Sequence, residues 1–262
     1  MSPRSIVRVM KTAYRCQVQE FVLRPHYFYI MVGQPVFFMA LSVFLFRHAG
    51  REDLVPCSVI GAGIIGIWNA NLFSSGMIVE RERRDGTLLF LVASPTDAIW
   101  VLLGRSLANS TVSACSVIIA LLLAASIAQQ AISVADYVLF LVSLLMTVGA
   151  VTALGLLAGC TFVWFRQALR VVGLMNWPAY ILSGVMFPIS YLPVALRAVS
   201  YILAPTWGLM GLRASFGISE GMSPVTIAAS LGILTCVYMC LAYHSYRLVL
   251  DRIRAEGRLA EW

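Results

Sequence analysis

Six long stretches without a charged residue limit what this chain can fold into. They are residues 28–46, 54–79, 106–128, 137–165, 171–187 and 225–246. A helix needs a run of about 20 apolar residues to cross the hydrocarbon layer of a membrane, and these stretches lack the short alternating pattern of barrel strands. With 60% hydrophobic residues, the chain also has too little polar surface for a single soluble core. It is therefore predicted to be an all-α polytopic membrane protein.

We expect one transmembrane domain over residues 1–262, with six transmembrane helices at residues 26–46, 54–79, 100–128, 137–165, 168–187 and 225–247. Loops on the cytoplasmic side of a membrane carry an excess of Lys and Arg. Of the 19 Lys and Arg residues, 15 fall in the terminal segments and in the loops on the same side of the membrane as the N-terminus. The loops on the opposite side contain only Arg47, Arg51, Arg197 and Arg213. Both termini and the loop after the second span are therefore expected in the cytoplasm. Lys11 is the single Lys, which is typical of a GC-rich bacterial genome, so we expect a bacterial cytoplasmic (inner) membrane.

Several other classes of protein are disfavoured. The net charge of +7 is explained by basic residues that flank the spans, without a nucleic-acid partner. The three histidines have no carboxylate or cysteine at metal-ligand spacing, and the six cysteines form no CxxC pair. The glycines of "GAGIIG", residues 61–66, match a dinucleotide fingerprint, but no strand precedes them, and close helix packing is the preferred interpretation. We predict no catalytic residue, no metal site and no cofactor bound by this chain.

The first 25 residues have the pattern of an amphipathic helix. Basic residues Arg8, Lys11 and Arg15 lie opposite an apolar set at helical spacing, which comprises Ile6, Val7, Met10, Tyr14, Val18, Phe21 and Val22. Such a helix binds the interface between headgroups and acyl chains. Residues 1–25 are therefore predicted to form an N-terminal amphipathic interfacial helix on the cytoplasmic side.

The second uncharged stretch is unusually polar in the half that is expected to face the cytoplasm. Asn69, Asn71 and Ser74 lie there. Polar side chains inside a membrane are costly and often line a pathway, but amides also join neighbouring helices. Both interpretations stay open: these residues either line a substrate path or hold helices together.

Prolines divide the apolar stretch of residues 188–214 into pieces. Pro188, Pro193 and Pro205 leave segments of about ten residues, which are too short to cross a membrane singly. Arg197 and Arg213 would also make a full crossing costly. We expect an outer re-entrant helical hairpin between spans 5 and 6; an outer structural cap is the simpler alternative.

The segment "ERERRDGTLLFLVASP", residues 80–95, places six consecutive charged residues in a chain with 12% charged residues. Gly86 permits a break, Thr87 can cap a helix, and Pro95 ends it. A short cytoplasmic helix is therefore predicted within residues 80–97. Its apolar residues beside mixed charges favour docking to a cytoplasmic partner over a solvated connector.

This segment resembles the cytoplasmic coupling segment of the type-2 ABC exporter permeases, in which a charged cluster precedes Gly-Thr-Leu, a hydrophobic turn and Ser/Thr-Pro. "SGVMFPISYLPVALRAVSYILAPTWGLMGLRA", residues 183–214, is similar to the outer signature of the same family. The six-span pattern covers the whole chain. Within the family, the chain resembles the daunorubicin-resistance-like drug exporters.

The resemblance implies a permease subunit that is not itself an enzyme. Two permeases, identical or paralogous, would pair with two cytoplasmic ABC ATPase subunits, which would bind ATP and Mg; this chain has no GxxxxGK[ST] motif. The ATPase-coupling residues would be Glu80, Glu82, Arg84, Gly86, Thr87, Leu88, Leu91 and Pro95. The outer gate would comprise Phe187, Pro188, Leu192, Pro193, Pro205 and Thr206.

The predicted function is ATP-driven export of an amphiphilic compound, such as a drug, an antibiotic, a lipid or a lipid-linked product. The alternative within the family is export of a polysaccharide or a lipid-linked glycan. A channel or membrane scaffold without an energy source would explain the spans, but not the pattern of Gly86, Thr87, Leu88 and Pro95. Co-purification with an ATPase distinguishes these classes.

Overall fold

The computed structural model describes residues 3–23, 29, 33–50, 55–75, 77–78, 81–82, 86, 97–128, 134–162, 168–185, 189–218 and 221–256. Within these residues the chain forms helices and no strands, as the uncharged stretches predict. The elements are α1 (Pro3–Leu23), α3 (Gln34–His48), α4 (Val55–Asn69), the π-helix η3 (Ala70–Ser75), α7 (Ala98–Ala128), α8 (Tyr137–Phe162), α9 (Ala168–Leu182), the 3-10 helix η4 (Ile189–Tyr191), α10 (Val194–Ser200), α11 (Ala204–Ser215) and α12 (Pro224–Glu256).

Three segments among the described residues are long and apolar enough to cross a membrane: Val55–Phe73, Tyr137–Cys160 and Pro224–Leu248. They confirm that the chain is a multi-pass membrane protein, and they coincide with the second, fourth and sixth predicted spans. Helices α3 and α9 have 15 residues each, and α7 has 31. The count of six crossings stays a prediction.

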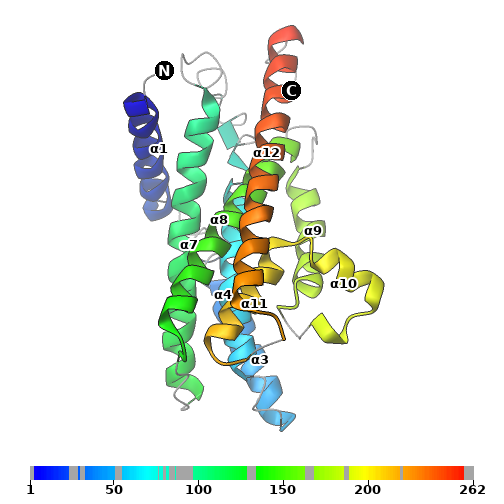
Figure 1. The fold of residues 1–262 in the computed structure, drawn as a ribbon. Helices are drawn as coiled ribbons and strands as arrows, with labels where there is room; N and C mark the ends of the chain where they lie inside the picture. Colours follow the sequence, from blue (N-terminus) through cyan, green and yellow to red (C-terminus); the bar gives the residue numbers. More distant parts are fainter. Residues whose placement is uncertain are drawn as a thin grey trace.

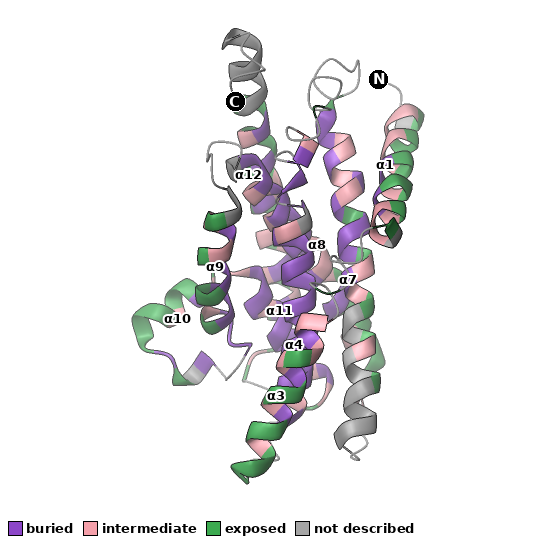
Figure 2. Cartoon of the chain, turned by 180° about the vertical axis from the view of Figure 1, so that it is seen from behind, coloured by how far each residue is buried: buried purple, intermediate pink, exposed green. Residues whose placement is uncertain are grey.

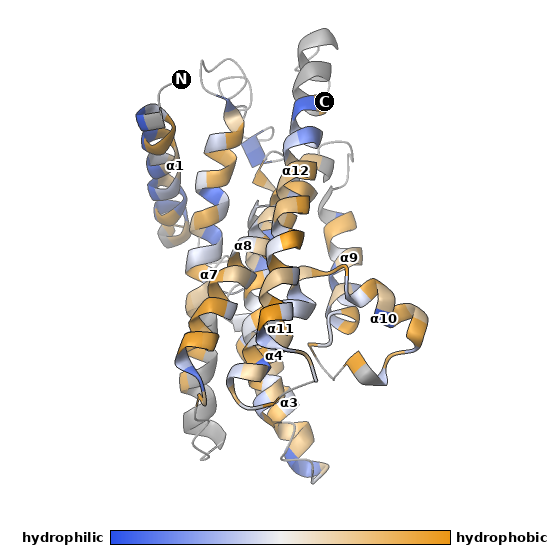
Figure 3. Cartoon of the chain, in the orientation of Figure 1, coloured by the Kyte–Doolittle hydropathy of each residue, from blue (hydrophilic) through white to orange (hydrophobic). Residues whose placement is uncertain are grey.

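The helices run along one another as a bundle, and the start of α1 and the end of α12 lie at the same end of it (Figure 1). Helix α4 is the central element. In the apolar segment that begins with α4, 94% of an 18-residue stretch is buried, whereas only 22% of the corresponding stretch of α12 is buried (Figure 2). Hydrophilic residues gather on α1 and near the C-terminal end of α12, and apolar residues dominate the middle of the bundle (Figure 3). This distribution is expected of a bundle with a lipid-facing middle and a hydrated end.

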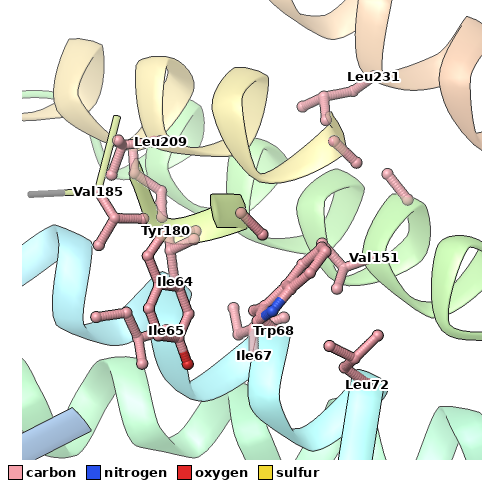
Figure 4. Packing of buried hydrophobic residues seen from close by; sticks show 14 of the residues in the cluster. Ile64, Ile65, Ile67, Trp68, Leu72, Val151, Tyr180, Val185, Leu209 and Leu231 are labelled. Atoms are coloured by element: carbon pink, nitrogen blue, oxygen red, sulfur yellow. The ribbon is translucent and has the colours of Figure 1, made fainter. Parts of the chain in front are cut away.

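The main core forms where α4, α8, α9, α11 and α12 meet. Trp68 and Tyr180 lie at its centre, with Val151, Leu209 and Leu231 around them (Figure 4). Close approach of the chain segments depends on glycine here. A Cβ at Gly61 would lie 2.5 Å from the backbone oxygen of Val185. The "GAGIIG" segment thus serves close packing, as its position in an apolar stretch indicated.

Candidate functional site

The charged segment after the second span is the first candidate site, and three of its residues lie in the described part of the chain. These are Arg81, Glu82 and Gly86. The other predicted coupling residues lie outside the described residues: Glu80, Arg84, Thr87, Leu88, Leu91 and Pro95. Gly86 adopts φ +71°, which favours glycine, and a Cβ there would meet no atom within 4 Å. This angle is not α-helical, which agrees with a break at Gly86; the short helix expected around it stays a prediction.

Arg81 links the start of this segment to the N-terminal helix. Its Nη1 donates to Oε1 of Glu20 in α1 at 3.2 Å, and the side chains of Arg81 and Glu20 are only 9% and 19% exposed. An ion pair that is mostly shielded from water is screened less than a surface pair. The pair therefore ties the end of the second span to α1.

Glu82 links the same segment to α7. Its carboxylate accepts a hydrogen bond from Nη1 of Arg105, and the side chains of Arg105 and Glu82 are 21% and 12% exposed. Consecutive residues of the charged run thus bind two different helices. Sequence reasoning assigned Glu82 to contact with a partner protein. It identified neither Arg105 as the residue that pairs with Glu82 nor Glu20 as the residue that pairs with Arg81.

Helix α1 lies lengthwise against the first turns of α7, and a glycine permits the contact (Figure 1). A Cβ at Gly104 would lie 2.6 Å from the backbone oxygen of Met10 and 3.0 Å from the Cβ of Ala13. The backbones themselves are in contact, so α1 cannot shift toward α7. The start of the charged segment, α1 and α7 are therefore held together. We call the four residues of the two ion pairs, Glu20, Arg81, Glu82 and Arg105, the coupling clamp.

The predicted path residue Asn69 is completely buried and joins three helices. Its Nδ2 donates to Oε1 of Gln34 in α3 at 3.2 Å, and the hydroxyl of Tyr180 in α9 donates to its Oδ1 at 2.5 Å. The preceding residue, Trp68, donates from its Nε1 to Oδ1 of Asn176 in α9 at 2.8 Å. In this conformation Asn69 holds α3, α4 and α9 together.

The predicted path residue Asn71 lies in the π-helix η3 and belongs to a second buried network. The hydroxyl of Ser110 in α7 donates to Oδ1 of Asn71 at 2.7 Å and lies 2.5 Å from the hydroxyl oxygen of Thr152 in α8. Nδ2 of Asn109 donates to the hydroxyl oxygen of Ser75 at 2.9 Å. Ser74 is also in η3, but its side chain is outside the described part of the structure.

A polar stripe on α7 completes this second network, and sequence reasoning missed it. Ser106, Asn109, Ser110 and Ser113 are all fully buried. Their spacing of i, i+3, i+4 and i+7 places them on one helix face, which was a readable signal in an apolar stretch. The stripe faces the π-helix, a type of element that is frequent at functional sites.

We expect Tyr180→Phe to lower the free energy of unfolding by about 1–2 kcal/mol, because the buried Oδ1 of Asn69 loses its donor. The apparent Tm in detergent should fall by about 3–5 °C. Tyr137→Phe is the control, since Tyr137 is 73% exposed. Equal Tm changes in the two variants would mean that the Tyr180 hydroxyl contributes nothing to the network.

The proline-divided segment forms the short helices α10 and α11. Of the predicted gate residues, Leu192, Pro205 and Thr206 are buried, and Pro193 is exposed at the N-cap of α10. Phe187 and Pro188 lie outside the described residues. The hydroxyl of Tyr238 in α12 donates to the backbone oxygen of Ile202, so the turn between α10 and α11 is held against α12.

Arg213 anchors the other end of α11. Its side chain is fully buried, and its Nη2 donates to the backbone oxygen of Gly184 at 2.9 Å. A buried guanidinium is stable only where acceptors surround it. This residue therefore connects α11 to the turn that follows α9. Within the described ranges, no group of three or more His, Cys, Asp or Glu residues is placed to hold a metal ion.

The chain matches a protein family, and the search of curated proteins found no match. Residues 8–216 match the sequence profile described as ABC-2 type transporter. The match includes α1 from Arg8 onward and all of the charged segment, α10 and α11, and it ends before α12. Members of the family generally pair with ATPase subunits and dimerise. The chain is a multi-pass membrane permease that belongs to the ABC-2 type transporter family.

Proposed function

We propose that this chain is the permease subunit of an ATP-driven exporter that moves an amphiphilic compound outward across the bacterial cytoplasmic membrane. Two permeases would pair with two cytoplasmic ATPase subunits, and the ATPases would bind ATP and Mg. The cargo would be a drug, an antibiotic, a lipid or a lipid-linked product, as in the daunorubicin-resistance-like exporters that the sequence resembles. Both chain ends and residues 80–97 would lie in the cytoplasm.

The coupling clamp is the observation that carries this proposal. Arg81 is bound to Glu20 of α1, and Glu82 is bound to Arg105 of α7. A displacement of residues 86–95 would be passed to these two contacts, which lie directly before the segment in the sequence. A displacement of residues 86–95 by an ATPase would therefore move α1 and α7, and with α7 the polar stripe that contacts η3.

The buried networks support a transport path in this part of the bundle. Ser110 of α7 is hydrogen-bonded to Asn71 of η3 and to Thr152 of α8, and Ser75 is bonded to Asn71 within η3. If α7 moves relative to η3, these groups lose their partners and need new ones, and the polar part of an amphiphilic cargo supplies them. In this proposal Asn69 and Asn71 serve as helix contacts in one state and as path residues in another, and Ser74 is a path residue.

The experiment that tests the proposal is purification of this chain from its native cells in mild detergent, with identification of the proteins that remain bound. We expect a soluble subunit with a Walker-type ATPase in a stoichiometric amount. A second, different permease in the sample would establish a heterodimer. Recovery of the chain alone, with no ATP turnover in any fraction, would refute the exporter function in favour of a channel or scaffold.

Gly86→Val should weaken ATPase binding by about fivefold, because a residue with a branched Cβ is strained by about 1–2 kcal/mol at positive φ. Gly50→Val is the matched control. Gly50 has φ +66°, and a Cβ there, as at Gly86, would meet no atom within 4 Å, but Gly50 precedes α4 rather than following it. Quantitative pull-down of the ATPase measures the effect. If both variants weakened binding equally, the segment after α4 would not be the docking site.

A further inference from the structure

We propose that the groove between α1 and α7 binds the headgroup of an anionic phospholipid. The groove has a volume of about 400 Å³ and lies on the side of the α1–α7 contact that is open to the surroundings. The groove shares Arg105 with the coupling clamp, but its ligand and its test do not depend on the proposed function.

The lining of the groove combines two guanidinium groups with apolar walls. Arg8 and Arg105 are its cationic residues, and Val9, Ala13 and Val101 are its apolar ones. Guanidinium groups bind phosphate oxygens through paired, charge-assisted hydrogen bonds. The apolar walls suit the glycerol and upper acyl carbons of a lipid, and they do not suit a free inorganic anion.

The donors in the groove are not all used within the protein. Arg8 is exposed, and its side chain forms no ion pair with any described residue. One Nη of Arg105 is bound to Glu82, but its buried Nε has no hydrogen-bond acceptor among the described residues. A buried N–H without an acceptor is costly. Because this Nε is buried, a phosphate oxygen in the groove would reach it only when the guanidinium turns toward the groove.

The position of the groove along α7 agrees with the headgroup layer of a membrane. Helix α7 has 31 residues. At 1.5 Å per residue it is about 46 Å long, whereas the hydrocarbon layer is about 30 Å thick. Roughly ten residues of α7 therefore lie in the headgroup regions. Val101 and Arg105 belong to the first eight residues of α7, at the end where the charged residues gather (Figure 3).

The other basic residues on the same face of α1 provide a matched control for Arg8. Arg4, Arg8, Lys11 and Arg15 are exposed and follow one another at spacings of four, three and four residues, so they share a helix face. Only Arg8 of this set lines the groove. General attraction of α1 to an anionic membrane involves all four residues, whereas a specific site depends on Arg8.

Cys16 lines the groove and is exposed, so its reaction with a maleimide reports whether the groove is occupied. The test uses full-length chain in nanodiscs, after replacement of the exposed Cys115, Cys236 and Cys240 by Ala. We expect phosphatidylglycerol to slow labelling about tenfold relative to phosphatidylcholine, also at 0.5 M salt, which screens long-range attraction. The control is Gln19→Cys in a chain with Cys16→Ala. Gln19 is exposed on α1 but does not line the groove, so labelling at this position measures the general effect of an anionic surface on a thiol.

Arg8→Gln should abolish the protection by phosphatidylglycerol, and Arg4→Gln should retain it within about twofold at high salt. Circular dichroism checks that both variants fold. Equal loss in the two variants would overturn the specific site. Protection by inorganic phosphate in phosphatidylcholine nanodiscs would identify a free anion as the ligand and overturn the lipid assignment. Protection by an ATPase subunit without any phosphatidylglycerol would identify a protein partner and overturn it as well.

Discussion

Arg105→Glu should reduce ATPase turnover that depends on this permease to less than about a tenth of the wild-type value. The substitution places two carboxylates together at the mostly buried site where Glu82 now accepts from Arg105. Removal of one partner from a shielded ion pair costs on the order of 3 kcal/mol. Since 1.4 kcal/mol corresponds to a factor of ten, the equilibrium for keeping the charged segment against α7 should shift by about a hundredfold.

The exchanged pair Arg105→Glu with Glu82→Arg should recover a large part of the turnover, because it restores opposite charges at one place. Arg247→Glu is the control for the change in charge: Arg247 is exposed near the end of α12, where it lies 4.6 Å from the ring centroid of Tyr243. The measurement is ATP hydrolysis by the permease–ATPase complex in nanodiscs. Wild-type turnover in a folded Arg105→Glu protein would contradict the coupling clamp.

Gly208→Ala should lower the free energy of unfolding by about 3 kcal/mol, although it adds a single methyl group. A Cβ at Gly208 would lie 2.4 Å from Cγ2 and 2.5 Å from Oγ1 of Thr147 in α8. Thr147 cannot turn away easily, because β-branched residues in a helix keep one or two rotamers and its hydroxyl donates to the backbone oxygen of Ser143 at 2.6 Å. The contact between α11 and α8 must therefore open.

Thermal unfolding in detergent measures this prediction, and we expect the apparent Tm to fall by about 10 °C. Thr147→Ala in the same chain should restore most of the loss, because it removes the two atoms that clash. Gly149→Ala on α8 is the control: a Cβ there would meet nothing within 4 Å, so the change should be neutral or slightly stabilising. Unchanged stability of Gly208→Ala would mean that α11 does not pack against α8 in this way.

The coarse architecture followed from the sequence alone, because the membrane leaves few solutions for an apolar chain. Backbone N–H and C=O groups in hydrocarbon must bond within the segment, so long uncharged stretches become helices. Helices α4, α8 and α12 confirm this at the predicted stretches. The prolines also marked helix starts: Pro193 is the N-cap of α10, and Pro205 lies in the first turn of α11. Proline fixes its own φ and suits these positions.

The charge and polarity of the candidate sites were visible in the sequence, but their partners were not. Arg81 pairs with Glu20 over 61 positions, and Tyr180 donates to Asn69 over 111 positions. Helical periodicity relates residues three or four positions apart and does not relate separate helices. Which helix supplies the opposite charge depends on how backbones approach at small residues such as Gly104. The sequence by itself therefore determined which segments are helices and where polar groups enter them, and only the tertiary structure decided which of these groups bind one another.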